Sequence, residues 1–274
     1  MAVWPETQSV FAQAIEVSML NRLLRAIIGR RVTTPEPKLR EVTPDFLKYR
    51  KINYGCGYDK REGHLNVDVD PECSPDFLIP PGDLSGLPKA HFDEVYAKDV
   101  LEHLPRNGSL GLLIEFASLL RPGGQLILQT TSVLHVARML EANPEFNQQF
   151  GWTICLFGNQ AHPGDFHFTG FTERTLHVHL AAAGFEIRAS ELVDGWMMKV
   201  DCVKRESWDA GMDAGSDLEF VDRSYRKFLD RDSDESGRQH FLQRLAQGDP
   251  RRDILRAIAS SPERLFVKAR QLGL

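Results

Sequence analysis

Residues 50–70 read RKINYGCGYDKREGHLNVDVD. A short apolar run ends at Tyr54, and the GCG turn at 55–57 suits a close approach of the backbone to a ligand, although a plain tight turn has the same composition. A second short run ends in Asp68. The order strand, glycine turn, strand, carboxylate predicts a nucleotide-like ligand. Asp68 follows the first glycine by thirteen residues rather than about twenty, and no third glycine follows, which disfavours NAD.

The composition is that of an ordinary globular chain. With 274 residues, 42% apolar and 26% charged, it can form one large domain or a main domain with a small appendage. A net charge of −5 gives no general attraction to nucleic acid, so we expect no nucleic-acid partner. No run approaches the roughly eighteen apolar residues of a membrane span, and the first basic residue is Arg22, unlike a signal peptide. We therefore expect a cytoplasmic protein.

Residues 1–47 are predicted to form an amphipathic helix and a linker. The helix, over 7–29, ends at Gly29, and the prolines within 32–47 disfavour regular structure there. A membrane-surface helix is one interpretation, and a helix docked on its own domain is the favoured one. The apolar positions are Leu20, Leu23, Leu24, Ile27 and Ile28, and the nearby basic ones are Arg22, Arg25, Arg30 and Arg31.

From residue 48 to 206 short apolar runs alternate with helical patterns. This alternation predicts an α/β domain with a Rossmann-like, mainly parallel seven-stranded sheet. The connection from Gly57 to Leu65 is too short for the usual helix, so we expect a curtailed first crossover. The predicted strands are 50–54, 65–69, 76–79, 93–98, 125–130, 185–192 and 195–203, and the helical patterns are 99–104, 108–120, 133–142 and 172–183.

The last part of the chain has a different pattern of residues. A polar linker is predicted over 207–217, followed by a small all-α bundle of about four short helices over 216–274. Asp249-Pro250 and Ser261-Pro262 each pair an N-cap residue with a proline at the first helical position, and Gly248 and Gly273 fall at helix ends. The stretch DRDSDESG (230–237) begins like a calcium loop but lacks the required glycine and final glutamate, so we predict a solvated turn.

Five motifs in order resemble class I S-adenosylmethionine-dependent methyltransferases, in particular a compact GCG…NVD…LEHL subgroup. They are NYGCG (53–57), NVD (66–68), GDLSGLP (82–88), FDEVYAKDVLEHL (92–104) and LLRPGGQLILQT (119–130), and the resemblance covers about 50–203. It implies S-adenosyl-L-methionine as cofactor. Asn53 departs from the wider class, which often has an acidic residue there.

The candidate cofactor-binding residues follow strand ends that share one edge of the sheet. Asp68 is suited to accept hydrogen bonds from both ribose hydroxyls, and Asp83 from an adenine amino group, with Leu84 packing on the ring. The full set is Asn53, Tyr54, Gly55, Cys56, Gly57, Asp68, Asp83, Leu84, Lys98 and Asp99.

The stretch GNQAHPGDFHFTGF (158–171) carries the candidate catalytic residues. Metal ligation by His162, Asp165 and His167 is one interpretation, but the spacing is not that of a helical zinc motif. A structural loop with backbone-bonded histidines is another. In the subgroup that the chain resembles, a similar run lies near the transferred methyl, and a histidine suits deprotonation of a hydroxyl. We predict His167 as the base with Asp165 orienting it, and His103 as the competing candidate.

No metal is expected. The four cysteines, Cys56, Cys73, Cys155 and Cys202, are scattered without CxxC spacing, so the sequence indicates neither a zinc site nor a disulfide framework.

Residues 218–263 resemble a small helical domain of unknown function that is often attached to bacterial glycosyltransferases and cell-surface proteins. The two resemblances together imply a methyltransferase acting on a sugar or glycan oxygen in surface-polysaccharide synthesis. Alternatives are a small-molecule O- or N-methyltransferase and a non-catalytic cofactor-binding protein. The expected partners are a small-molecule or glycan acceptor, and a membrane surface or a glycosyltransferase contacted through the N-terminal helix or the C-terminal bundle.

Overall fold

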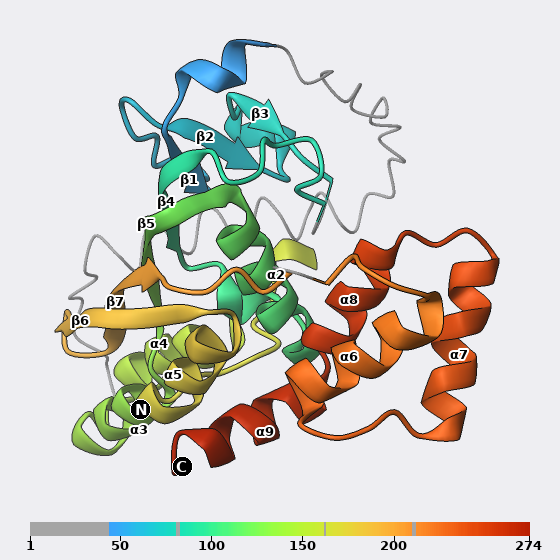
Figure 1. Cartoon of the computed structure of the whole chain (residues 1–274). Helices are drawn as coiled ribbons and strands as arrows, with labels where there is room; N and C mark the ends of the chain where they lie inside the picture. The colour runs from blue at the N-terminus through green and yellow to red at the C-terminus, as the bar shows by residue number, and fades with distance from the viewer. Residues whose placement is uncertain (1–43, 81–82, 162, 210–211) are drawn as a thin grey trace, which may run out of the picture.

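The computed structural model describes residues 44–80, 83–161, 163–209 and 212–274. The helix predicted over 7–29, and His162, lie outside the described residues. The sheet has seven strands in the order β3-β2-β1-β4-β5-β7-β6, and only β7 runs antiparallel to its neighbours, which confirms the predicted fold class (Figure 1). The strands are β1 Lys51–Tyr54, β2 Leu65–Asp68, β3 Phe77–Leu78, β4 Phe92–Lys98, β5 Leu120–Thr131, β6 Phe185–Val193 and β7 Met197–Lys204.

The short apolar runs form the buried central strands of the sheet. Leu65, Ile52, Val95 and Leu126 are register partners on four neighbouring strands, and each is 0% exposed. Burying one such side chain stabilises the fold by about 1.5–3 kcal/mol relative to exposure. Because side chains alternate along a strand, this row fixes which side chains point to each face of the sheet.

Two helices cover one face of this sheet. Helix α2 (Arg106–Leu119) packs on β5, helix α5 (Glu173–Ala182) packs on β6, and the two helices contact each other. Helix α5 begins at a capping box formed by Thr172 and Thr175, which agrees with the predicted start at residue 172.

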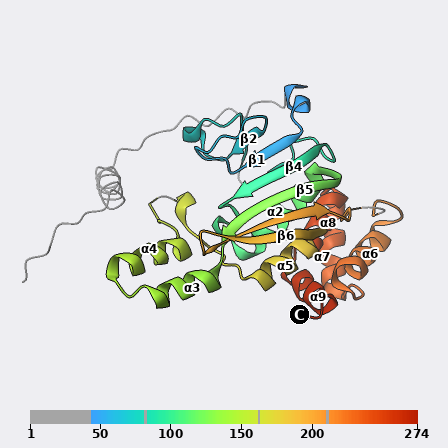
Figure 2. The same cartoon turned by 90° about the vertical axis from the view of Figure 1, so that its left-hand side faces the viewer.

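Helices α3 (Val133–Ala142) and α4 (Phe146–Phe157) form a hairpin that follows β5 and projects away from the sheet (Figure 2). Helix α3 has the predicted bounds, but α4 was not predicted. Its sequence, FNQQFGWTICLF, contains no charged residue and lacks a polar face opposite an apolar one. None of its twelve residues is buried.

Three local predictions differ from the structure. The linker ends in a 3-10 helix, η1 (Pro44–Lys48), because Phe46 is buried with its ring centroid 4.6 Å from that of Phe77. The helix predicted over 99–104 is a single 3-10 turn, η3 (Leu101–His103). Strand β5 begins at Leu120 rather than at the predicted residue 125, because Leu120 already pairs with Phe92 across a β-bulge.

The predicted four-helix bundle is present, as α6 (Asp217–Leu229), α7 (Glu235–Ala246), α8 (Arg251–Ala259) and α9 (Pro262–Gln271). Ser261 and Pro262 take their predicted positions at the start of α9, whereas Pro250 itself is the N-cap residue of α8. Gly248 and Gly273 have φ of +97° and +73°, as helix-terminating glycines often do.

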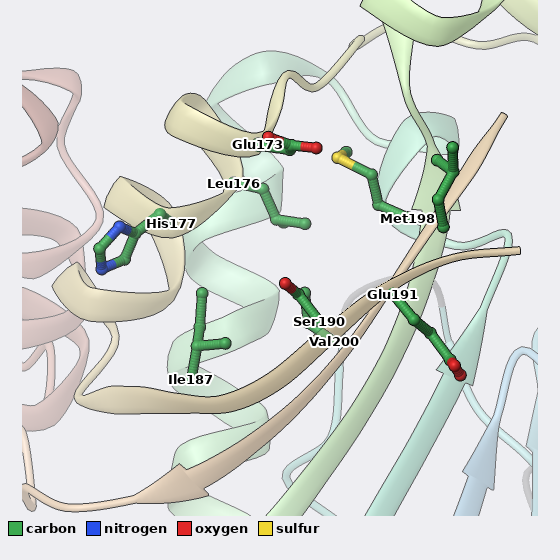
Figure 3. Close-up of a pocket in the computed structure, with 9 residues that line it drawn as sticks. Glu173, Leu176, His177, Ile187, Ser190, Glu191, Met198 and Val200 are labelled. Atoms are coloured by element: carbon green, nitrogen blue, oxygen red, sulfur yellow. The ribbon is translucent and has the colours of Figure 1, made fainter. Parts of the chain in front are cut away.

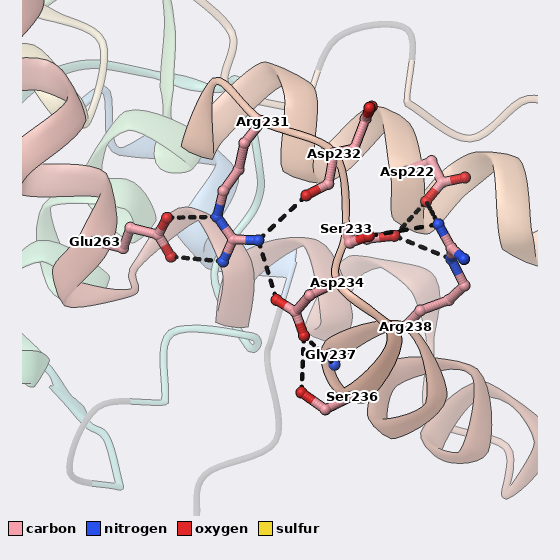
Figure 4. A network of polar contacts seen from close by, with 9 residues as sticks. All are labelled: Asp222, Arg231, Asp232, Ser233, Asp234, Ser236, Gly237, Arg238 and Glu263. Carbon is pink, nitrogen blue, oxygen red and sulfur yellow. Dashed lines mark hydrogen bonds and ion pairs between the residues drawn. The ribbon is translucent and has the colours of Figure 1, made fainter.

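The predicted turn over 230–237 is present over 230–234, between α6 and α7, whereas 235–237 already belong to α7 (Figure 4). The Asp234 carboxylate accepts hydrogen bonds from the Gly237 amide at 2.8 Å and the Ser236 hydroxyl at 2.7 Å, which caps α7. These bonds, with an ion pair to Arg231, hold the pKa of Asp234 far below its usual value. Arg231 also makes a two-pronged ion pair with Glu263 of α9, so the turn joins three helices.

The bundle and the sheet share one buried apolar cluster. Helix α8 packs on α2 and helix α9 packs on α5 (Figure 1). The predicted polar linker contributes to this contact, since Trp208 and Met212 are 4% and 5% exposed. The Trp208 indole N–H donates to the Ser118 hydroxyl at 2.8 Å. No described helix has both the length and the apolar character that crossing a bilayer demands.

Candidate active site

The turn after β1 needs glycine for two different reasons. Gly55 has φ +64°, and a Cβ there would lie 2.5 Å from the Val100 side chain. Gly57 has φ +47°, and no atom lies within 4 Å of the place its Cβ would take. The Gly55 amide donates to the Val67 carbonyl at 2.9 Å, which ties the turn to β2. The turn is therefore packed on one side and open at Gly57, where a ligand can approach the backbone.

Asp68 lies at the end of β2 beside this opening. One carboxylate oxygen accepts from the Gly57 amide at 2.8 Å and the other from the Asp70 amide at 2.9 Å. A carboxylate offers about four lone-pair sites, so each oxygen keeps one for a further donor. Two fixed acceptors of this kind suit the two hydroxyls of a ribose, and the open cradle at Gly57 leaves room for it. The residues present therefore fit a nucleoside cofactor.

Four of the predicted cofactor-binding residues are buried near the strand ends, among them Cys56. Asn53, 3% exposed, donates to the Asp59 carbonyl at 2.8 Å and to Asn66 Oδ1 at 3.0 Å, which holds the loop that replaces the first crossover helix. Burial raises the pKa of Tyr54 to about 12, and Leu84, 1% exposed, lies in the apolar core. Their side chains shape the loops rather than face solvent.

Asp83 and Lys98 are exposed after β3 and at the end of β4. The Asp83 carboxylate accepts from the Ser85 amide at 2.8 Å. Hydrogen bonding with Ser85, aided by the charge of Arg256 from the bundle, lowers the pKa of Asp83. The carboxylate is thus available as an acceptor at neutral pH.

Asp99, directly after β4, has a left-handed backbone with φ +52° and donates its amide to the Gln129 carbonyl at 3.1 Å. Non-glycine residues in this conformation are uncommon and cluster at functional sites. Although Asp99 is exposed, the surrounding protein desolvates its carboxyl, and this effect together with the nearby Glu102 charge raises its pKa to about 6. Asp99 is therefore a carboxyl that titrates just below neutral pH.

The two candidate bases lie together. The rings of His103 and His167 have centroids 4.6 Å apart and meet edge to face at 85°. His167 Nδ1 lies 3.0 Å from the Cys155 carbonyl, and His103 Nδ1 lies 3.2 Å from the Phe166 carbonyl. Because a carbonyl only accepts, each Nδ1 carries the hydrogen and each neutral ring keeps its lone pair on Nε2.

His167 is predominantly neutral at physiological pH. Burial is the largest influence and lowers its pKa below the ordinary value, with a smaller lowering from His103. Glu102 and Asp165 act in the opposite direction through their negative charges. A neutral imidazole with a lone pair on Nε2 is the form that can accept a proton.

The ring of His167 is oriented at Nδ1 by a backbone group. The Cys155 carbonyl, in the last turn of α4, accepts from this nitrogen. Asp165 ends the short 3-10 helix η4 (Pro163–Asp165) and affects His167 through its charge. The chain can return so closely to α4 because Gly158 has no side chain, since a Cβ there would lie 1.7 Å from the Asp165 carbonyl oxygen.

Glu102 belongs to this site and was not predicted. It is 2% exposed, and its carboxylate accepts from the hydroxyl of Thr130 at 2.9 Å and from the amide and hydroxyl of Thr131 at 3.3 Å. Its backbone carbonyl accepts from the Phe168 amide at 2.7 Å. Glu102 therefore joins η3, the end of β5 and the histidine loop. The sequence signal that could have found it is a carboxylate within the apolar run VLEHL. Its partners, the paired threonines at the end of β5, are evident only in the structure.

The fold also gathers side chains that are distant in the sequence. Ligand atoms of Cys56, Asp68 and Cys73 all lie within 4.8 Å of one another, although the cysteine spacing indicated no such group. Cys73 ends the 3-10 helix η2 (Pro71–Cys73) after β2. Burial and the Asp68 charge raise the pKa of Cys73 to about 12, and burial is the main cause of a raised pKa at Cys56.

A separate cavity of 290 Å³ lies between α5 and the β6–β7 pair (Figure 3). Glu173 and His177 line it from α5, and Ser190 and Glu191 from β6, around an apolar wall that includes Met198. None of the residues predicted for the site contributes to it, so the residues at the strand ends remain the candidate active site.

Two family models match the chain. A model described as a methyltransferase domain matches residues 34–190, and one described as a domain of unknown function matches residues 206–266. A search of curated proteins found no match.

Solved structures with a similar fold include three with low sequence identity. A Burkholderia thailandensis 1,6-didemethyltoxoflavin-N1-methyltransferase is 17% identical with a TM-score of 0.40, and the match covers 74% of this chain and 94% of that one. A Mesorhizobium loti S-adenosylmethionine dependent methyltransferase is 17% identical with a TM-score of 0.42, over 61% and 96%. A Pyrococcus horikoshii protein is 14% identical with a TM-score of 0.43, over 71% and 92%.

Proposed function

We propose that this chain methylates a hydroxyl oxygen of a sugar or glycan intermediate in bacterial surface-polysaccharide synthesis. The chain belongs to the methyltransferase domain family and is an S-adenosylmethionine-dependent methyltransferase. The observation that carries the choice of oxygen is the histidine pair. Both rings are held by backbone carbonyls in the tautomer whose Nε2 accepts a proton. A hydroxyl needs such a base, because the neutral group is a poor nucleophile.

The cofactor would be held at the carboxyl ends of β1, β2 and β4. The Asp68 carboxylate would accept from the ribose hydroxyls, and the backbone at Gly57 would lie against the nucleoside. Asp83 would accept from the adenine amino group. When bound, S-adenosylmethionine supplies an electrophilic methyl group on a sulfonium.

The protein's part in the reaction is to place the acceptor and to take up one proton. With the cofactor bound, the hydroxyl proton of the acceptor would pass to His167 Nε2 as the acceptor oxygen takes the methyl group and leaves S-adenosylhomocysteine. The nearby charges of Glu102 and Asp165 would stabilise the imidazolium that results. His167 would then lose the proton to solvent. Proximity and this proton transfer are the main catalytic requirements.

The choice of a sugar has a separate basis. The C-terminal bundle resembles a domain that accompanies bacterial glycosyltransferases and surface proteins, and a family model for a domain of unknown function covers it. This argument rests on the domains with which the bundle is found, and not on the chemistry of any residue in it. The exposed carboxyl of Asp99, whose charge interacts with His103, and the exposed ammonium of Lys98 are groups that commonly hydrogen-bond sugar hydroxyls.

The experiment is methyl transfer from radiolabelled cofactor to a panel of nucleotide-activated sugars, lipid-linked sugars and, as a comparison, small phenols and amines. We expect label in an alkali-stable ether of a sugar. Label confined to amines would overturn the assignment to oxygen, and label confined to small phenols would overturn the assignment to sugars.

We further propose that the protein works in the cytoplasm and approaches the membrane or a glycosyltransferase through its N-terminal helix or its bundle. Lipid-linked acceptors lie at that surface. Sedimentation of the full chain with anionic vesicles checks the first contact, and Leu23→Asp should reduce it by interrupting the predicted apolar face. Equal sedimentation of the variant would contradict a role for the helix.

A further inference from the structure

The cluster of Cys56, Asp68 and Cys73 has the geometry of a set of metal ligands. Its three ligand atoms lie within 4.8 Å of one another, and they come from the turn after β1, the end of β2 and helix η2. Cys56 and Cys73 are 3% and 4% exposed. Two thiolates and a carboxylate around one point form a common environment for zinc, which takes three protein ligands and a water where a site stays open.

The contacts around the three side chains are compatible with a cation. Each Asp68 oxygen accepts one backbone amide, which orients the carboxylate and leaves a lone pair on each oxygen. The Lys60 ammonium lies 3.1 Å from Cys56 Sγ, and a contact of this kind fixes the direction of a thiolate ligand in a metal site. The Cys73 thiol donates to the Asp70 carbonyl at 3.0 Å, and it would give up this bond when it loses its proton to bind the ion.

The charges of the three ligands and of Lys60 indicate which class of ion the cluster would bind. Two thiolates and one carboxylate carry three negative charges, while a divalent cation and Lys60 together carry three positive ones. The neutral sum offsets the cost of burying the group. Thiolate ligands select zinc-like transition metals over magnesium or calcium, which prefer oxygen.

We propose that Cys56, Asp68 and Cys73 bind a divalent transition-metal cation of the zinc type. Binding releases the two thiol protons to solvent and changes no oxidation state. Because Asp68 also faces the cofactor position, the ion and S-adenosylmethionine compete for it. The competition rests on the proposed function, whereas the metal site does not.

The test uses the full chain, treated with chelator and kept reduced with a non-thiol reductant. Titration with Co²⁺ should produce a thiolate-to-metal charge-transfer band that saturates at one equivalent. Cys73→Ser should weaken Co²⁺ binding by about 100-fold or more, since changes merely behind the ligands already cost about 10–100-fold. Cys202→Ala is the matched control, a buried cysteine of β7 outside the cluster, and should keep the band. Retained cofactor binding by Cys73→Ser shows that this variant is folded.

A second measurement needs no variant. Zn²⁺ should protect Cys56 and Cys73 of the wild type from alkylation, located by peptide mass, and should leave Cys155 reactive. No band, or an equal band in Cys73→Ser, or no protection, would overturn the metal site. Calorimetry of S-adenosylmethionine with and without Zn²⁺ should show at least about a tenfold loss of affinity. An unchanged affinity would overturn the competition alone. Methyl transfer by the metal-free protein tests the proposed function separately.

Discussion

The two sides of the candidate active site are built in different ways. On the proposed cofactor side, the turn at 55–57 and Asp68 are held by backbone hydrogen bonds to β2 and its neighbours, and the residues behind them are buried. On the proposed acceptor side, His167 is held by the end of α4, a helix with no buried residue. The first side is part of the core, and the second projects from it.

This difference indicates how the two ligands are recognised. The cofactor side presents fixed acceptors whose positions depend on the sheet, which suits one invariant cofactor. The acceptor side presents exposed apolar side chains, among them Phe157 and Phe168, next to the histidines. Such a surface can change to fit another acceptor without disturbing the sheet, so mutations on the two sides should separate binding of cofactor from turnover.

The largest effect is expected from Asp68→Ala, which tests the cofactor side. It removes two charge-assisted hydrogen bonds to the ribose, each worth about 1.5–3 kcal/mol, so the dissociation constant of S-adenosylmethionine should rise about 100-fold or more. Calorimetry measures it. Asp70→Ala, an exposed neighbour whose amide contact to Asp68 is retained, is the control. Wild-type affinity in the Asp68 variant would remove this residue from the cofactor site.

His167→Ala tests the acceptor side. Turnover should fall about 100-fold or more because the base is lost, while cofactor affinity stays unchanged. His177→Ala, in the cavity beside α5, should leave turnover intact. In the wild type, kcat should rise with pH and the midpoint of the rise should lie below the ordinary pKa of histidine, since burial lowers the pKa of His167 and only the neutral ring accepts a proton. This rise should vanish in His167→Ala. Near-normal turnover would transfer the role to His103.

Glu102→Gln tests whether the two sides are joined through a positioning residue. We expect roughly a tenfold loss of turnover, because an amide fits the space but cannot accept from all three of its present donors. Removing the charge also lowers the pKa of His167 further, so the midpoint of the pH profile should move down. Glu115→Gln, another buried acid, lies in α2 and should leave the midpoint in place. A loss of stability with no movement of the midpoint would argue for a purely structural role.

The smallest effect concerns Asp99→Asn. The folded state raises the pKa of this carboxyl from 3.8 to about 6, so the protonated form is favoured and native stability is lost as pH rises through that interval. The amide cannot ionise. Its melting temperature should match the wild type near pH 4 and exceed it by about a few degrees above pH 6. Parallel curves at all pH values would show that Asp99 is not desolvated.

Much of the cofactor side could be predicted from sequence because its signals are local. A strand, a glycine turn and a terminal carboxylate lie within 50–70, and the structure places them side by side. The acceptor side could be predicted only in part. His103 and His167 were both candidates, but the orienting Cys155 carbonyl is a backbone group, which no residue type encodes. Helix α4 has no polar and apolar faces to distinguish. Glu102 needed its tertiary partners, Thr130 and Thr131, to be recognised.

The buried indole of Trp208 has a consequence for how the chain unfolds. It links Ser118 of α2 to the segment that leads into the bundle, and residues of both family regions form one apolar cluster. Two sequence families therefore share a single cooperative unit, and calorimetry should record one heat-absorption peak rather than two. The surfaces of α2 and α5 that contact α8 and α9 should therefore matter as much for the stability of the bundle as the helices of the bundle themselves.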